Sequence, residues 1–63
     1  MPVKVREAIR RLRQEGWVQT SQEGSHRQFE HPTRPGKVTV PGHLNDDTAP
    51  AVWASIRRQA GLK

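Results

Sequence analysis

The absence of cysteine is the feature that most constrains how this chain can fold, because the chain is also short. Its 63 residues leave room for one domain, and a domain of this size buries only about 60% of the surface that its unfolded chain exposes. Disulfides or a cysteine-held zinc ion often compensate for so small a core, and neither can form here. Only 32% of the residues are hydrophobic. We therefore expect one small domain with a thin core.

Two segments have the spacing of apolar residues that predicts amphipathic helices. The first covers about residues 3–15 and ends at Gly16, a typical residue for the C-terminal end of a helix. The second covers about residues 49–59, with Thr48 as a candidate N-terminal cap and Pro50 in the first turn. The predicted buried positions are Val5, Ala8, Ile9 and Leu12 in the first helix and Val52, Ile56 and Ala60 in the second.

Three short segments between these helices predict β-strands, at residues 17–22, 26–31 and 37–40. Gly24 suits a tight turn between the first two strands, and residues 32–36 form a loop rich in proline and glycine. The order α-β-β-β-α predicts an α+β fold, in which two helices pack on one face of a three-stranded antiparallel sheet.

Alternation along the strands predicts which side chains line the open face of this sheet. A sheet that is covered by helices on one side has one apolar face and one face in contact with water. We expect Phe29, Val38 and Val40 to face the helices. Because successive side chains of a strand point to opposite faces, the residues expected on the open face are His26, Gln28 and Glu30.

Two pairing registers are compatible with this alternation, and they place His43 differently. The first pairs Phe29 with Val40. It sets His26 directly opposite His43. The second pairs Phe29 with Val38. The two histidines are then offset by two positions but remain near each other.

A pair of histidines on one face suits RNA cleavage without a metal ion. This reaction needs a base that removes the proton of the 2′-hydroxyl and an acid that protonates the leaving oxygen, and imidazole can do either near neutral pH. A nearby cation would stabilise the charge of the transition state, and Arg27 or Lys37 could supply it. The alternative is that each histidine is a surface or packing residue, as most histidines in strands are. We expect that structural role for His31, which precedes Pro32.

The charge of the chain points to a polyanionic partner. Eleven lysines and arginines against six acidic residues give a net charge of +5, with an isoelectric point near 11.2. Arginine predominates among these cations, and its planar fork matches phosphate geometry. Arg6, Arg10 and Arg13 share one face of the first predicted helix. The candidate contacts to RNA are these three arginines together with Arg27, Lys37 and Gln28. The alternative is a solvated helix face.

Other classes of site and location are less compatible with the sequence. His26 and His31 are not accompanied by a cysteine or a well-spaced carboxylate that would complete a metal site, so we expect no metal or other cofactor. No apolar run approaches the ~18 residues that a membrane span needs. No apolar segment follows a basic start, so we expect no signal peptide. We therefore expect a cytoplasmic protein that does not bind membranes.

Several segments of the chain form a recognisable pattern, at residues 16–17, 24–29, 31–33, 38–43 and 55–62. Together, in this order and at this spacing, they resemble the HicA family. The sequence Gly-Ser-His-x-Gln-Phe at residues 24–29 is the most specific of them. The resemblance spans nearly the whole chain, and it implies a single HicA-like domain over residues 1–63.

The resemblance implies a fold, an activity and a partner. HicA proteins are toxins of bacterial and archaeal toxin–antitoxin pairs, they cleave mRNA, and their fold resembles a double-stranded-RNA-binding domain. The histidine after Gly-Ser is catalytic in the family, which corresponds to His26, with Gly24 and Ser25 in the supporting turn. The expected partners are the mRNA substrate and a HicB-type antitoxin, and contact with DNA is expected only through that antitoxin. His43 is the candidate second proton carrier.

Two alternatives remain, a non-catalytic double-stranded-RNA-binding module and an inactive toxin homologue. Such a module grips phosphates with lysines at the start of its last helix, where this chain has Asp46, Asp47 and Thr48. The same region departs from the HicA pattern, because it lacks the usual glycine and adds Trp53. We expect this departure to affect antitoxin contacts more than catalysis.

Overall fold

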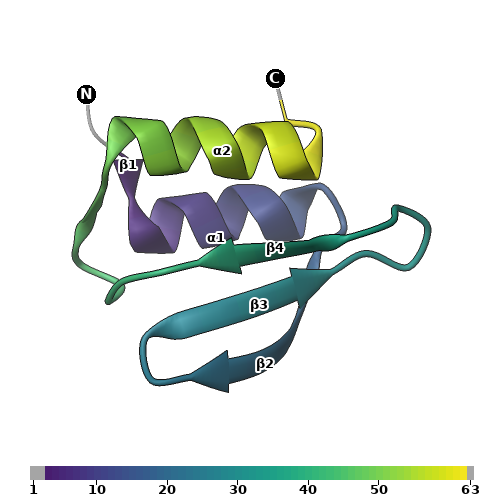
Figure 1. Ribbon diagram of the computed structural model, residues 1–63, viewed down its shortest axis with the longest axis horizontal. Helices are drawn as coiled ribbons and strands as arrows, with labels where there is room; N and C mark the ends of the chain where they lie inside the picture. The colour runs from purple at the N-terminus through teal and green to yellow at the C-terminus, as the bar shows by residue number, and fades with distance from the viewer. Residues whose placement is uncertain (1–2, 63) are drawn as a thin grey trace.

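Two helices cover one face of a three-stranded antiparallel sheet in the computed structural model, which describes residues 3–62 (Figure 1). In chain order the elements are β1 (Val3–Lys4), α1 (Val5–Gln14), β2 (Val18–Glu23), β3 (His26–Glu30), β4 (Lys37–Val40), β5 (Asp47–Thr48) and α2 (Pro50–Ala60). This confirms the predicted α+β class and its α-β-β-β-α core. None of the helices in residues 3–62 has the length and apolar character needed to cross a membrane.

The first helix begins two residues later than the sequence pattern predicts. Val3 and Lys4 form β1, which pairs antiparallel with Thr48 and Asp47 of β5. The backbone N–H of Val5 then donates to the carbonyl oxygen of Asp46 at 2.9 Å. The prediction of a helix from residue 3 was therefore wrong, because pairing with a distant segment takes these residues into a second, two-stranded sheet.

The main sheet has the strand order β2-β3-β4 and adopts the second of the two registers considered from the sequence. Phe29 pairs with Val38, and Arg27 pairs with Val40. A register with Phe29 opposite Val40 is therefore wrong. The predicted first strand is also shifted by one residue, because Trp17 precedes β2 and is buried in the core.

The core lies between the sheet and the two helices. The inward positions of β3 and β4 meet the apolar stripes of α1 and α2, as the alternation and the helical spacing predict. Phe29, Leu12 and both valines of β4 are completely inaccessible to solvent. The cluster consists of Val5, Ile9, Leu12, Trp17, Phe29, Val38, Val40, Ile56 and Ala60.

Helix α2 begins without the side-chain cap that was predicted for it. Ala49 is the N-terminal capping residue and makes no side-chain hydrogen bond to the helix. Thr48 lies in β5 instead, where its side chain is buried and its Oγ1 has no hydrogen-bond partner among residues 3–62. Pro50 is in the first turn, as expected, and Gly61 ends the helix in the left-handed conformation at φ +72°.

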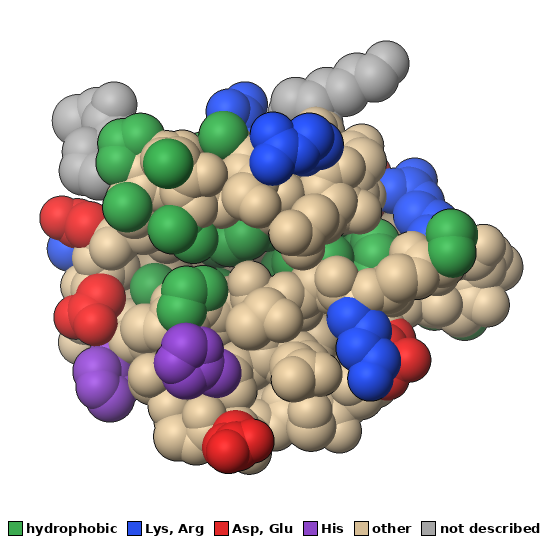
Figure 2. Space-filling model, viewed as in Figure 1, with side chains coloured by type: hydrophobic (Ala, Val, Ile, Leu, Met, Phe, Trp, Pro, Cys, Tyr) green, Lys and Arg blue, Asp and Glu red, His purple; other side chains and the backbone are tan. Residues whose placement is uncertain are grey.

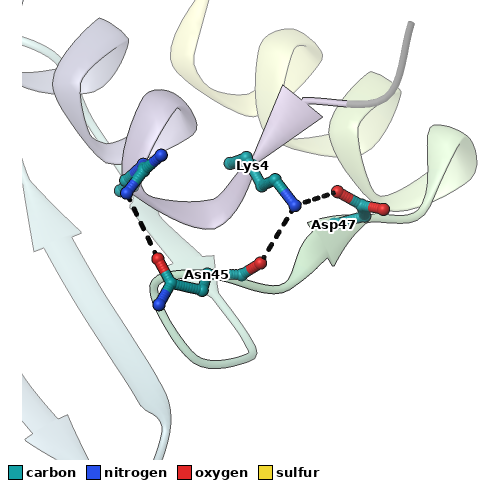
Figure 3. Close-up of polar contacts among 4 residues, drawn as sticks. Lys4, Asn45 and Asp47 are labelled. Carbon is teal, nitrogen blue, oxygen red and sulfur yellow. Dashed lines mark hydrogen bonds and ion pairs between the residues drawn. The ribbon is translucent and has the colours of Figure 1, made fainter.

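A polar network joins the start of the chain to the loop before α2 (Figure 3). Lys4 Nζ contacts Asp47 Oδ1 at 3.0 Å and donates to the carbonyl oxygen of Asn45 at 3.2 Å. Arg6 Nη1 donates to Asn45 Oδ1 at 3.2 Å. These contacts hold the β4–β5 loop, which carries His43, against the first turn of α1.

Candidate functional site

His26 is the exposed first residue of β3, and it lies on the open face of the sheet. It borders two shallow hollows of about 460 and 420 Å³. The first is also lined by Glu23, Gly24, Gln28 and Thr39. The second extends from His26 over Thr39 and Pro41 to helix α2, where its lining consists of Ala51, Val52, Ser55, Ile56 and Gln59. His26 is therefore accessible to a ligand from two sides.

The turn before His26 is held from both of its strands. Gly24 has φ +59°, a left-handed conformation that glycine adopts without strain. Gln22 Nε2 donates to the carbonyl oxygen of Gly24 at 3.0 Å, and Arg27 Nη1 reaches that of Ser25 at 3.4 Å. The predicted turn at Gly24 and Ser25 thus has a defined conformation, from which β3 starts.

Gln28 also lies on the open face, as predicted, two residues after His26 in the same hollow. It pairs with Thr39 of β4, so both side chains point to this face. Sequence reasoning missed Thr39 as a neighbour of His26. The alternation of β4 contains the signal for it, because Thr39 lies between two inward-facing valines.

His43 lies in the loop after β4, at the end of the sheet where β3 begins. Continuing the observed register by one residue places His26 opposite Pro41, so the two histidines are offset by two positions, as the second register predicts. The backbone N–H of His43 donates to Asp46 Oδ2 at 3.1 Å, and its carbonyl oxygen accepts from the N–H of Asp46 at 2.9 Å. The side chain is exposed, and Figure 2 shows histidine side chains on the visible face below the start of α2.

Neither cation that was predicted to assist His26 lies beside it. Arg27 follows His26 directly, so its side chain points to the helix side of the sheet, where Nη1 donates to the carbonyl oxygen of Gly42 at 2.9 Å. Lys37 pairs with Glu30 at the far end of the hairpin, about 13 Å along the strand from His26. Neither hollow at His26 is lined by a lysine or an arginine among the residues that the structure describes.

The predicted RNA contacts of the first helix lie, together with Arg27, on the opposite side of the sheet from His26. Arg6, Arg10 and Arg13 of α1 and Arg27 of β3 line a hollow of about 660 Å³, which we call the arginine groove. Its other lining residues are Ile9, Gln14, Gln19, Gln22 and Leu44. The structure thus brings four predicted residues together, but in a place separate from the predicted proton carriers.

His31 has a structural environment. Its Nδ1 accepts hydrogen bonds from the backbone N–H groups of Thr33 at 3.1 Å and Arg34 at 3.2 Å. Its Nε2 lies 2.9 Å from the carbonyl oxygen of Glu15, and its ring packs edge-on against Trp17. These contacts agree with the structural role expected from the sequence. Within residues 3–62, no group of three or more metal-ligating side chains comes together.

Comparison with known protein families gives a match over most of the chain. The model of the family described as the HicA toxin of bacterial toxin–antitoxin matches residues 5–62. No curated protein matches the chain. The matched residues include both helices, the main sheet and every candidate site residue. Because the match covers nearly the whole chain and agrees with the observed fold, this protein belongs to the HicA family, the toxins of bacterial toxin–antitoxin systems.

Proposed function

We propose that this HicA-family toxin is a ribonuclease that cleaves mRNA in the cytoplasm without a metal ion, and that His26 carries the proton transfer. The accessible position of His26 supports the proposal most directly. His26 is exposed on the open face, it follows a turn of defined conformation, and it borders two hollows that could receive the nucleotides on either side of a phosphate. Family membership gives the toxin a cognate antitoxin as its partner, and we propose that this is a HicB-type protein that covers the face around His26.

The reaction that suits this site is transesterification within the RNA chain. His26 removes the proton from a 2′-hydroxyl, and the 2′-oxygen forms a bond to the adjacent phosphorus. The bond from phosphorus to the 5′-oxygen of the next nucleotide breaks, and that oxygen takes a proton from a general acid. The products are a 2′,3′-cyclic phosphate and a 5′-hydroxyl.

Two neighbours of His26 have roles in this scheme. His43, on the loop at the same end of the sheet, is the candidate general acid. Gln28 lies in the hollow with His26, and its side-chain amide can donate to a phosphate oxygen as negative charge develops. Gln28 would take the role that a cation often has, because neither hollow is lined by an arginine or a lysine among the described residues.

A non-catalytic module for double-stranded RNA fits this surface less well. Modules of that type hold the duplex backbone with lysines at the start of the last helix. Here Asp46 and Asp47 precede α2, and Asp47 forms an ion pair with Lys4. Arg57 and Arg58 lie in the last turn of that helix, at its other end.

The first test is a growth assay with induced wild-type protein beside His26→Ala, with total RNA examined from both cultures. The proposal expects growth arrest and mRNA degradation with the wild type, and neither with His26→Ala. Circular dichroism of the purified variant checks that it is folded, which the exposure of His26 leads us to expect. If both proteins are harmless, the activity is absent. If both arrest growth and degrade mRNA, His26 does not carry the chemistry.

A further inference from the structure

The arginine groove concentrates positive charge in a way that folding does not require. Arg6, Arg10 and Arg13 are spaced along one face of α1, and like charges four residues apart on a helix destabilise it. Among described residues, the lining of the groove includes no aspartate or glutamate. Glu7 contacts Arg10 at 3.6 Å, but both side chains are exposed to solvent, so this ion pair offsets little of the repulsion. A ligand with several negative charges would remove the repulsion.

The other lining residues suit the backbone of a nucleic acid. Gln14, Gln19 and Gln22 contribute side-chain amides, which commonly bond to phosphate and sugar oxygens. The guanidinium groups can each pair with two phosphate oxygens. Ile9 and Leu44 provide an apolar part of the lining.

The groove and His26 lie on opposite faces of β3. Arg27 lines the groove, and its neighbour His26 lines the hollows of the open face. At the end of the sheet where β3 begins, Arg27 Nη1 donates hydrogen bonds to the carbonyl oxygens of Ser25 and Gly42. Because the adjacent residues His26 and Arg27 of one strand line the two surfaces, a ligand that passes over this end of the sheet can reach both faces.

We propose that the arginine groove is a binding site for the backbone of single-stranded RNA, and that the strand passes over the sheet end at Ser25 and Gly42 to reach His26. This inference rests on the proposed ribonuclease activity. A duplex is too stiff to turn around the end of a sheet, since double-stranded DNA has a persistence length of about 150 base pairs. A single strand bends freely, so the groove selects single strands that are long enough to span both faces.

The groove therefore governs affinity for RNA, whereas His26 governs cleavage. The test measures binding separately from cleavage, in the His26→Ala background, by fluorescence anisotropy with a long single-stranded RNA and with the duplex of the same sequence. The groove variant is Arg10→Gln combined with Arg13→Gln. Arg58→Gln is the control, because Arg58 is an exposed cation on α2 that lies outside the groove.

We expect the double variant to bind the single strand about tenfold more weakly at low salt. The slope of log affinity against log salt should become less negative by about 1.4, since each of the two lost phosphate contacts to a single strand contributes about −0.7. Arg58→Gln should keep the slope of the parent, and the duplex should bind more weakly than the single strand. Thermal unfolding should show that the double variant is at least as stable as its parent, because it removes like charges.

Three results would overturn the inference. One is that Arg58→Gln weakens binding as much as the groove variant does, which would indicate a diffuse charge effect. Another is that the duplex binds the parent as tightly as the single strand does, and that the groove variant weakens the binding of both equally. The third is unchanged RNA affinity together with loss of the antitoxin complex, which would assign the groove to the antitoxin. A groove that binds RNA in a protein that does not cleave it would contradict the proposed function instead.

Discussion

The imidazole Nε2 of His31 lies 2.9 Å from the carbonyl oxygen of Glu15. Because Nδ1 of the same ring accepts from two backbone N–H groups, the neutral ring carries its proton on Nε2 and donates it to Glu15. The His31 side chain thus provides hydrogen-bond partners for a backbone carbonyl at the end of α1 and for two backbone N–H groups of the β3–β4 loop. The His31 side chain is consequently held in place by hydrogen bonds to the backbone, whereas the side chains of His26 and His43 are exposed.

Replacement of His31 should lower stability. We expect His31→Ala to reduce the free energy of unfolding by about 1–2 kcal/mol, since it leaves three backbone groups to water and removes the edge contact with Trp17. Urea denaturation measures the change. His43→Ala is the matched control, and this exposed site should change stability by less than about 0.5 kcal/mol. Equal effects of the two substitutions would contradict the structural role of His31.

The close approach of His31 to Gly16 makes a second prediction. A Cβ built on Gly16 would lie 2.7 Å from His31 Nε2, and the backbone at Gly16 has φ +92°. Gly16→Ala should therefore cost more than the ~1 kcal/mol that is typical of alanine in a left-handed conformation. Gly36→Ala is the control, because Gly36 has φ +85° but no atom of the described residues lies within 4 Å of the added Cβ.

The comparison of these two glycines isolates the steric contact. In the His31→Ala background, Gly16→Ala should cost no more than Gly36→Ala does, because the imidazole that it would meet is gone. Thermal or urea unfolding of the wild type, Gly16→Ala, His31→Ala and the double variant completes this double-mutant cycle. A Gly16→Ala cost that is unchanged by the loss of His31 would show that backbone strain alone is responsible.

Thr48 provides a prediction of the opposite sign. Its Oγ1 is buried and has no hydrogen-bond partner within the described part of the chain, and an unsatisfied buried hydroxyl costs about 1–3 kcal/mol. Valine has the same shape without the hydroxyl. We expect Thr48→Val to raise the free energy of unfolding by about 1 kcal/mol, measured by urea denaturation. A decrease would mean that the hydroxyl has a partner in solution.

Most of the fold could be predicted from local patterns. The helical spacing of Val5, Ile9 and Leu12 and the alternation around Phe29 and Val38 are determined by neighbouring residues, so they are visible in the sequence. The short β1–β5 pair could not be predicted. It joins segments that are more than forty positions apart, and its two residues per strand have no pattern of their own.

The site was predicted less completely. The residues of the open face follow from alternation, but two registers shifted by two residues bury the same side chains, so alternation could not choose between them. Sequence reasoning also assigned Arg27 as a cation beside His26. The positions of the two side chains contained the information to reject this, because consecutive residues of a strand point to opposite faces. The convergence of Arg27 with the arginines of α1 depends on how α1 packs on the sheet.

The most direct test of the proposed function is end-group analysis of RNA that has been incubated with the purified protein in excess chelator, beside a His26→Ala sample. Mass spectrometry of the fragments identifies their ends. Transesterification through His26 predicts 2′,3′-cyclic phosphates and 5′-hydroxyls from the wild type, and intact RNA from the folded variant. Fragments with 3′-hydroxyls and 5′-phosphates, or undiminished cleavage by His26→Ala, would contradict it.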